Sequence, residues 1–102
     1  KKGKDIVSLD LRKISSSVSD YFIICHADSS TQVRAIADSV EHEMDKVLNE
    51  NLWHKEGQGN AEWILLDYVS VVVHIFKTDK REFYGVEELW GDAQSQRFES
   101  AS

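Results

Sequence analysis

The segment Trp63–Phe76, WILLDYVSVVVHIF, restricts the fold more than any other stretch of the chain. Two apolar runs are separated by a few residues, which predicts a β-hairpin with its turn at Asp67–Ser70. In the expected register, Leu66 faces Val71 across the antiparallel ladder. An isolated hairpin is only marginally stable in water, so this one needs further strands and a covering layer.

The alternation of side chains divides the hairpin into two faces. The first face is aliphatic and holds Ile64, Leu66, Val71, Val73 and Ile75. The second mixes aromatic, apolar and polar groups: Trp63, Leu65, Asp67, Val72, His74 and Phe76. Rigid aromatics with a few polar groups are typical of binding surfaces. Two interpretations stay open: the second face docks another molecule, or a terminal segment covers it and Asp67 only caps the turn.

Three further segments are expected to be extended. Residues 5–11 alternate, with Val7 among the side chains directed inward. Residues 21–27 are apolar on both faces, as in the middle of a covered sheet. Residues 52–60 contain a short extended piece and a flexible turn that Gly57 supplies together with Gly59.

One long amphipathic helix is predicted over residues 29–51, with a capping box formed by Ser29 and Gln32. Its apolar stripe at helical spacing consists of Val33, Ile36, Ala37, Val40, Met44, Val47 and Leu48. The acidic segment 41–45, EHEMD, is interpreted as a solvated face rather than a metal site. The helix is therefore expected to cover the aliphatic face of the hairpin.

Short helical turns are predicted over residues 78–93, with a second capping box at Asp79 and Glu82. Phe83, Val86 and Trp90 lie at helical spacing, and Trp90 with Phe83 is expected to staple these turns to the sheet. The fold class is thus α/β, a single domain with a mixed β-sheet flanked by helices over residues 1–93. The polar residues 94–102 are expected to form a disordered tail.

Composition narrows the class of partner. The net charge is -6, and no basic block is longer than KKGK at the start. A phosphate-binding footprint is missing, so direct sequence-specific binding of nucleic acid is not expected. An acidic domain suits a basic protein partner. With one cysteine, no apolar stretch long enough to span a bilayer and no signal-peptide core, a cytoplasmic location and no membrane association are expected.

No catalytic, metal or cofactor site is predicted. Metal-dependent phosphoryl or nucleotidyl transfer needs two or three neighbouring carboxylates, but only Asp67 lies on the hairpin, with Asp10 the nearest further candidate. No glycine-rich phosphate loop precedes a helix. Cys25 and His26 are adjacent in a strand, so they point to opposite faces. His74 is interpreted as a structural or interface histidine rather than a catalytic one.

Seven blocks occur in the order and spacing of a known family: DIVSLDL, SDYFII, SSTQVRAIAD, EWILLDY, VVVHIF, REFY and LWGDA. Over about residues 4–93 the chain resembles the ribosomal silencing factor family, also called Iojap-related proteins. The resemblance implies a reduced nucleotidyltransferase-like fold without the metal-binding carboxylates. It also implies a non-enzymatic translation repressor.

Such a repressor binds the large ribosomal subunit through ribosomal protein L-fourteen. It sterically blocks association with the small subunit, notably when nutrients are limiting. The alternatives are a metal-dependent nucleotidyltransferase-like enzyme on the same fold, or a dimeric adaptor. The family pattern includes an additional N-terminal helix that is not found in this chain, and its absence is expected to favour a homodimer in isolation.

Partner contacts follow from the family blocks and from the second hairpin face. The residues expected to bind the partner are Trp63, Leu65, Asp67, His74, Phe76, Tyr21, Asp20, Tyr68, Arg81 and Tyr84. Trp63 is expected to be the anchor, since truncating a buried interface aromatic costs about 2 kcal/mol or more. Asp67 is expected either to pair with a Lys or Arg of the partner or to fix the turn.

Overall fold

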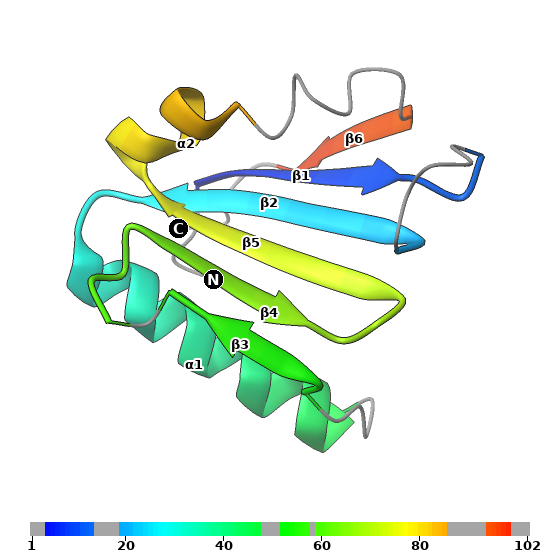
Figure 1. Cartoon of the computed structure of the whole chain (residues 1–102), viewed down its shortest axis with the longest axis horizontal. Coiled ribbons are helices and arrows are strands. Elements are labelled where there is room, and N and C mark those ends of the chain that lie inside the picture. The colour runs from blue at the N-terminus through cyan, green and yellow to red at the C-terminus, as the bar shows by residue number, and fades with distance from the viewer. Residues whose placement is uncertain (1–3, 14–18, 48–51, 58, 86–93, 99–102) are drawn as a thin grey trace.

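A computed structural model describes residues 4–13, 19–47, 52–57, 59–85 and 94–98. The elements along the chain are β1 (Lys4–Asp10), β2 (Tyr21–Ala27), α1 (Ser30–Val47), β3 (His54–Glu56), β4 (Trp63–Asp67), β5 (Val71–Lys77), α2 (Thr78–Tyr84) and β6 (Gln94–Phe98). The six strands of the described residues form one sheet in the order β3-β4-β5-β2-β1-β6. Figure 1 shows α1 lying along one face of this sheet and α2 at one end of it. The expected single α/β domain with a mixed sheet is confirmed.

The middle of the sheet is its one parallel pair among the described strands, β2 with β5. Between them the chain passes through α1, β3 and β4, a crossover long enough to return the chain in the same direction. Both central strands are covered on their two faces, which explains why residues 21–27 and 71–77 read as nearly continuous apolar runs.

The β4–β5 hairpin forms as predicted, but its register differs by two residues. Leu66 pairs with Val73 rather than Val71, and Asp67 pairs with Val72. The turn has the predicted length of four residues but lies one residue further along the chain, because the pair Asp67–Val72 closes it and Tyr68 N–H donates to the Val71 carbonyl at 2.8 Å. An even shift leaves every side chain on its original face, whereas an odd shift would exchange the faces. The predicted division of the hairpin into two faces is therefore correct although the pairing was wrong.

The aliphatic face packs under α1, as predicted. The buried cluster on this side contains Cys25, Ala27, Val33, Ile36, Ala37, Ala61, Ile64, Leu66, Tyr68, Val73 and Ile75. The helix starts where expected, since Ser29 Oγ accepts the Gln32 N–H at 3.2 Å. The Gln32 side chain reaches back to the N–H of Asp28 rather than that of Ser29. Half of the predicted capping box is thus present, and residues 48–51 of the predicted helix lie outside the described residues.

The opposite face has its own buried cluster, built by β1, β2 and β5. It contains Val7, Leu9, Leu11, Phe22, Ile24, Val72 and Phe76, with Trp63 and Leu65 packed against it. The inward alternation of β1 is as predicted. Because both faces carry apolar clusters, the sheet is the middle layer of the domain rather than its surface.

The helix α2 begins one residue before the predicted capping box. Its N-cap is Lys77, which makes no side-chain cap hydrogen bond, and Asp79 lies within the first turn. The prediction of a cap at Asp79 is therefore wrong. The Thr78 hydroxyl instead donates to the Ala27 carbonyl at 3.0 Å, joining α2 to the end of β2. Gly85 ends the helix at a φ of 60°.

Two sequence predictions at the C-terminus have different outcomes. The predicted disordered tail is wrong over β6, because Gln94–Phe98 pairs antiparallel with β1. The prediction was wrong because it was based on the polar composition of this segment. A short edge strand is held mainly by backbone hydrogen bonds to its neighbour and can lack an apolar face. Trp90, which the sequence predicts to staple the final turns to the sheet, lies outside the described residues. Neither described helix is long and apolar enough to cross a membrane.

The connection from β3 to β4 is held in place rather than free. Gly57 has a φ of 89°, and a Cβ there would lie 1.9 Å from the Trp63 carbonyl oxygen. Arg34 of α1 donates to the Gly59 carbonyl at 2.8 Å, and Ser30 donates to the Asn60 carbonyl at 3.2 Å. The predicted flexible turn is thus anchored to α1 in its described residues.

Candidate functional site

Five rings of the described residues gather on the sheet face opposite α1, and we call them the aromatic cluster. Its members are Phe22, Trp63, His74, Phe76 and Tyr84. The Trp63 ring lies between its neighbours, with centroids 5.0 Å from Phe76 and 4.7 Å from Tyr84. The His74 ring meets Phe22 edge to face at 4.6 Å. Offset and edge contacts of this kind add about 0.5 to 1.5 kcal/mol per pair beyond area burial, so the cluster is a rigid unit.

His74 is the polar centre of the cluster. The Trp63 indole Nε1–H donates to His74 Nδ1 at 3.1 Å, which fixes Nδ1 as the acceptor and places the imidazole proton on Nε2. That Nε2 atom is buried and has no hydrogen-bond partner among the described residues. Burial lowers the pKa of His74 from 6.5 to about 4, partly opposed by the charge of Asp67. The imidazole is therefore neutral at pH 7 and orients Trp63.

Exposure separates the predicted contact residues of this face into two levels. Phe76 and His74 are only 0% and 4% exposed, so in this structure they lie beneath the surface. Trp63 and Leu65 are half-buried, and Tyr84 is 42% exposed. The surface is thus provided by Trp63, Leu65 and Tyr84, with Phe76 and His74 as their support. The expectation that these residues bind a partner stays a prediction, and burial limits direct contact to the upper level.

The β4–β5 turn carries the second group of polar functions. Ser70 N–H donates to the Tyr68 carbonyl at 2.9 Å across Val69, whose φ is 75°. This is the pattern of a γ-turn with a positive central φ, which is rare and strained, and more so for a β-branched residue. Asp67 Oδ1 accepts the Val69 N–H at 2.8 Å. The turn-capping interpretation of Asp67 is therefore correct, which leaves its second oxygen for another partner.

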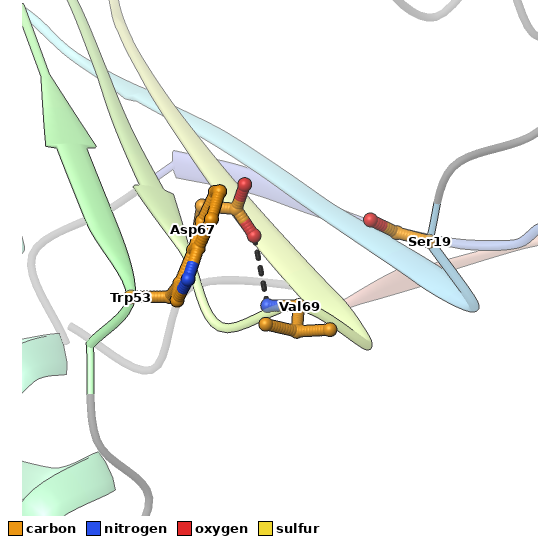
Figure 2. Close-up of a pocket in the computed structure, with 4 residues that line it drawn as sticks. All are labelled: Ser19, Trp53, Asp67 and Val69. Atoms are coloured by element: carbon orange, nitrogen blue, oxygen red, sulfur yellow. Dashed lines mark hydrogen bonds between the residues drawn. The ribbon is translucent and has the colours of Figure 1, made fainter.

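A pocket of about 420 Å³ opens beside this turn, and we call it the turn pocket. Ser19, Trp53, Asp67 and Val69 line it (Figure 2). The figure shows the Trp53 ring beside the Asp67 carboxylate, with Val69 below and Ser19 across the gap. Trp53 is 70% exposed and Val69 60%. This pocket could not be predicted from the sequence, because neither Trp53 nor Val69 belongs to an apolar period. The only sequence signal for it is a Trp within a polar segment.

The other predicted contact residues lie in separate places. Asp20 is exposed and Tyr21 half-buried, and both donate backbone N–H groups to the Ser70 carbonyl, close to the turn pocket. Tyr68 is 5% exposed and packs on the α1 side, where burial and the nearby carboxylates of α1 raise its pKa. Arg81 Nη1 lies 2.7 Å from His26 Nδ1. The ten predicted residues therefore do not form one continuous patch.

Groups that would support chemistry are not brought together in the described part of the chain. Among those residues, no three His, Cys, Asp or Glu side chains are placed to hold one metal ion. Burial raises the pKa of the Cys25 thiol to about 11, so the reactive thiolate is scarce at neutral pH. The Asp10 carboxylate receives Arg12 N–H groups at 2.8 and 3.0 Å, which lowers its pKa to about 2. These contacts are structural, and the surfaces described above are suited to docking.

Comparison with known proteins gives the family. The model of a family described as "Ribosomal silencing factor during starvation" (RsfS) matches residues 1–102, which includes β6 beyond the blocks recognised in the sequence. The RsfS of Halalkalibacterium halodurans is 42% identical over 102 residues, covering 97% of this chain and 83% of that protein. The RsfS of Bacillus subtilis is 44% identical over 93 residues, covering 91% and 77%. The chloroplastic protein Iojap of Zea mays is 37% identical over 76 residues, covering 72% of this chain and 31% of that protein.

Solved structures agree with the sequence comparison. A crystal structure of a Chromobacterium violaceum protein has a TM-score of 0.82 at 38% identity, covering 88% of this chain and 73% of that one. A Bacillus halodurans crystal structure gives 0.74 at 34% identity, covering 97% and 86%. The fold, the two-sided sheet and the sequence relatives lead to one conclusion: the chain belongs to the ribosomal silencing factor (RsfS) family of translation regulators, to which the Iojap proteins are related.

Proposed function

We propose that this protein binds the large ribosomal subunit through ribosomal protein L-fourteen and there blocks association with the small subunit. The observation that supports this proposal best is the exposed edge of the aromatic cluster. Trp63 and Tyr84 offer ring surface to solvent while Phe76 and His74 hold them from beneath. A preorganised aromatic surface loses little conformational entropy on binding, which favours a docking role.

Charge supports a basic protein as the partner. The net charge of -6 repels the phosphates of ribosomal RNA but attracts a lysine- and arginine-rich ribosomal protein. Contact with a protein allows an acidic domain to reside on a ribosome without a basic RNA-binding surface. Inhibition then needs no chemistry, because a folded domain held at the subunit interface excludes the other subunit by its volume.

The proposal is tested by co-sedimentation with isolated large subunits, followed by addition of small subunits. Wild-type protein is expected to sediment with large subunits and to reduce the yield of joined ribosomes. Tyr84→Ala removes a 42% exposed ring from the proposed surface and is expected to weaken retention about tenfold. Trp63→Ala is expected to weaken it about thirtyfold, equivalent to about 2 kcal/mol.

A matched control separates surface effects from general ones. Glu43→Ala changes an exposed residue of α1, on the opposite side of the sheet, and is expected to bind as wild type. Circular dichroism establishes that each variant is folded before sedimentation. Wild-type protein that stays in the supernatant at low micromolar concentration would contradict the proposal. Retention without inhibition of joining would contradict its second part.

No observation favours the alternative of a metal-dependent nucleotidyltransferase-like enzyme. Such an enzyme needs carboxylates that converge on one point. Here Asp67 caps its own turn and Asp10 is paired with Arg12. The described acidic residues of α1 lie on the other side of the sheet from the aromatic cluster. We therefore do not propose catalysis.

A further inference from the structure

We propose that the turn pocket receives one lysine or arginine side chain of the basic protein partner, with its aliphatic stem against Val69 and Trp53 and its charge at Asp67. This inference rests on the proposed function and deepens it by naming the chemistry of one contact. The aromatic cluster is a different surface, toward the other end of β4. The two would act as separate contacts with one partner.

The first argument is the composition of the pocket walls. An indole and a valine side chain provide apolar surface, and a carboxylate provides the only described charge among the lining residues. One Asp67 oxygen is used by the Val69 N–H, and no side chain of the described residues pairs with the other. Long basic side chains match this arrangement, since they bury their methylene stems on apolar surface and keep the charge on a polar group. The indole face adds cation–π attraction for the same charge.

The second argument is the strain at Val69. A β-branched residue at a φ of 75° is unfavourable, and it persists only where the surroundings fix the backbone. Four hydrogen bonds do so here: Val69 N–H to Asp67, Ser70 N–H to Tyr68, and the N–H groups of Asp20 and Tyr21 to the Ser70 carbonyl. The result is a valine that costs stability and yet is 60% exposed. A contact with a partner would make use of that exposed apolar group.

The third argument is the position of the pocket along β4. Trp63, Leu65 and Asp67 alternate onto the same face of the strand, so the row runs from the aromatic cluster to the pocket. Four residues of strand span about 13 Å. That distance lies well within one protein interface of ordinary size. Asp20 beside the pocket extends the negative potential, which favours a basic protein over RNA.

The test uses three variants of the pocket. Two of them change residues of the turn while preserving its backbone, and the third removes the exposed Trp53 ring. Asp67→Asn keeps the cap oxygen and removes the charge, Val69→Gly removes the exposed side chain and the strain, and Trp53→Ala removes the indole. Asp38→Asn removes the same charge from the exposed side of α1 and is the matched control. Val69→Gly is expected to raise the midpoint of unfolding, so weaker binding by that variant cannot come from misfolding.

In the first experiment the ¹⁵N-labelled protein is titrated with the peptide acetyl-Gly-Lys-Gly-Lys-Gly-amide and followed by NMR. Saturable shifts are expected at the Trp53 indole N–H and the Val69 amide, with the Trp63 indole unchanged. Asp67→Asn is expected to weaken the peptide affinity about tenfold, and Asp38→Asn to leave it unchanged. Shifts confined to Trp63, equal weakening by both charge variants, or a response of Trp53 to a single-stranded RNA oligonucleotide instead of the peptide would each overturn the proposal.

In the second experiment the same variants are sedimented with large subunits. Asp67→Asn and Trp53→Ala are expected to weaken retention about tenfold, and Val69→Gly several-fold. If wild type is retained, Trp63→Ala loses retention and all three pocket variants bind as wild type, the proposed function stands and the pocket inference fails. If wild type is not retained, the proposed function fails, and the peptide titration alone decides whether the pocket binds basic side chains.

Discussion

The two faces of the central sheet solve the problem of burial in different ways. The α1 face is sealed by one 18-residue helix whose apolar stripe lies on aliphatic strands. The opposite face is built around rings and leaves Trp63 and Tyr84 partly open. It also contains a buried imidazole whose Nε2 has no hydrogen-bond partner among the described residues. A face that served only stability would not need a buried histidine or half-exposed rings. The α1 face therefore serves the fold, and under the proposed function the opposite face also provides the docking surface.

Truncation of Ile75 and Phe76 should separate the two roles most clearly. These neighbours in β5 are both 0% exposed and point to opposite faces. Either substitution by Ala is expected to cost about 4 kcal/mol, measured by urea unfolding. Only Phe76→Ala should also weaken binding of the remaining folded protein to large subunits, because Trp63 and Tyr84 lose their support. Equal binding by both variants would remove the functional difference between the faces.

Gly57→Ala is expected to be the next largest effect. The new Cβ would collide with the Trp63 carbonyl at a residue already in a left-handed conformation. We expect a loss of at least about 3 kcal/mol in the free energy of unfolding. Gly59→Ala is the control, because nothing lies within 4 Å of a Cβ at that position. Similar losses for both variants would show that the turn tolerates no side chain anywhere, rather than at the approach to Trp63.

Acid should destabilise the aromatic face through His74. The folded state holds its pKa near 4, whereas the unfolded chain binds a proton near 6.5. Between these values the unfolded state carries more protons, so stability falls as the pH is lowered from about 6.5 to 4 and levels off below that. The loss is expected to be at most about 3 kcal/mol.

The pH dependence is measured by urea unfolding of wild type and His74→Gln at a series of pH values. The slope in this window should be reduced in His74→Gln and unchanged in His42→Gln, which alters an exposed histidine of α1. An unchanged slope in His74→Gln would mean that other groups cause the acid sensitivity.

Val69→Gly should give the smallest effect and the opposite sign. Removing a β-branched side chain from a φ of 75° is expected to stabilise the fold by about 1 kcal/mol, which thermal unfolding measures. Val71→Gly, in the neighbouring strand, should destabilise because it weakens β5 and its packing. A destabilised Val69→Gly would show that the exposed valine packs usefully and is not strained.

Much of the fold could be predicted because the local sequence pattern of most elements agrees with the burial they have in the tertiary structure. The period of α1, the alternation of β1 and β4 and the two-sided apolar character of β2 each match the environment that the element finally occupies. Pattern failed for β6, whose polar residues are placed by backbone pairing with β1. It also failed at Asp79, because Thr78 is drawn to the end of β2 and starts α2 earlier.

The candidate site was only partly predictable, for a related reason. The sequence assigned Trp63, Leu65 and Phe76 to one face because alternation alone decides that. The sequence could not predict how deeply each residue is buried, since the burial of His74 and Phe76 depends on Phe22 from β2 and Tyr84 from α2. The sequence could not predict the turn pocket either, because Trp53 and Ser19 come to Asp67 from other parts of the chain.

By itself, the sequence determined the class of the domain, the division of its central hairpin into two faces, the acidic character and, through the family blocks, the kinship with ribosomal silencing factors. These properties follow from local period, composition and order. Tertiary structure decided the hairpin register, the strand β6, the neutral His74 beneath Trp63 and the strained Val69 beside the pocket. Each of these depends on which distant groups come together, and chain period carries no information about that.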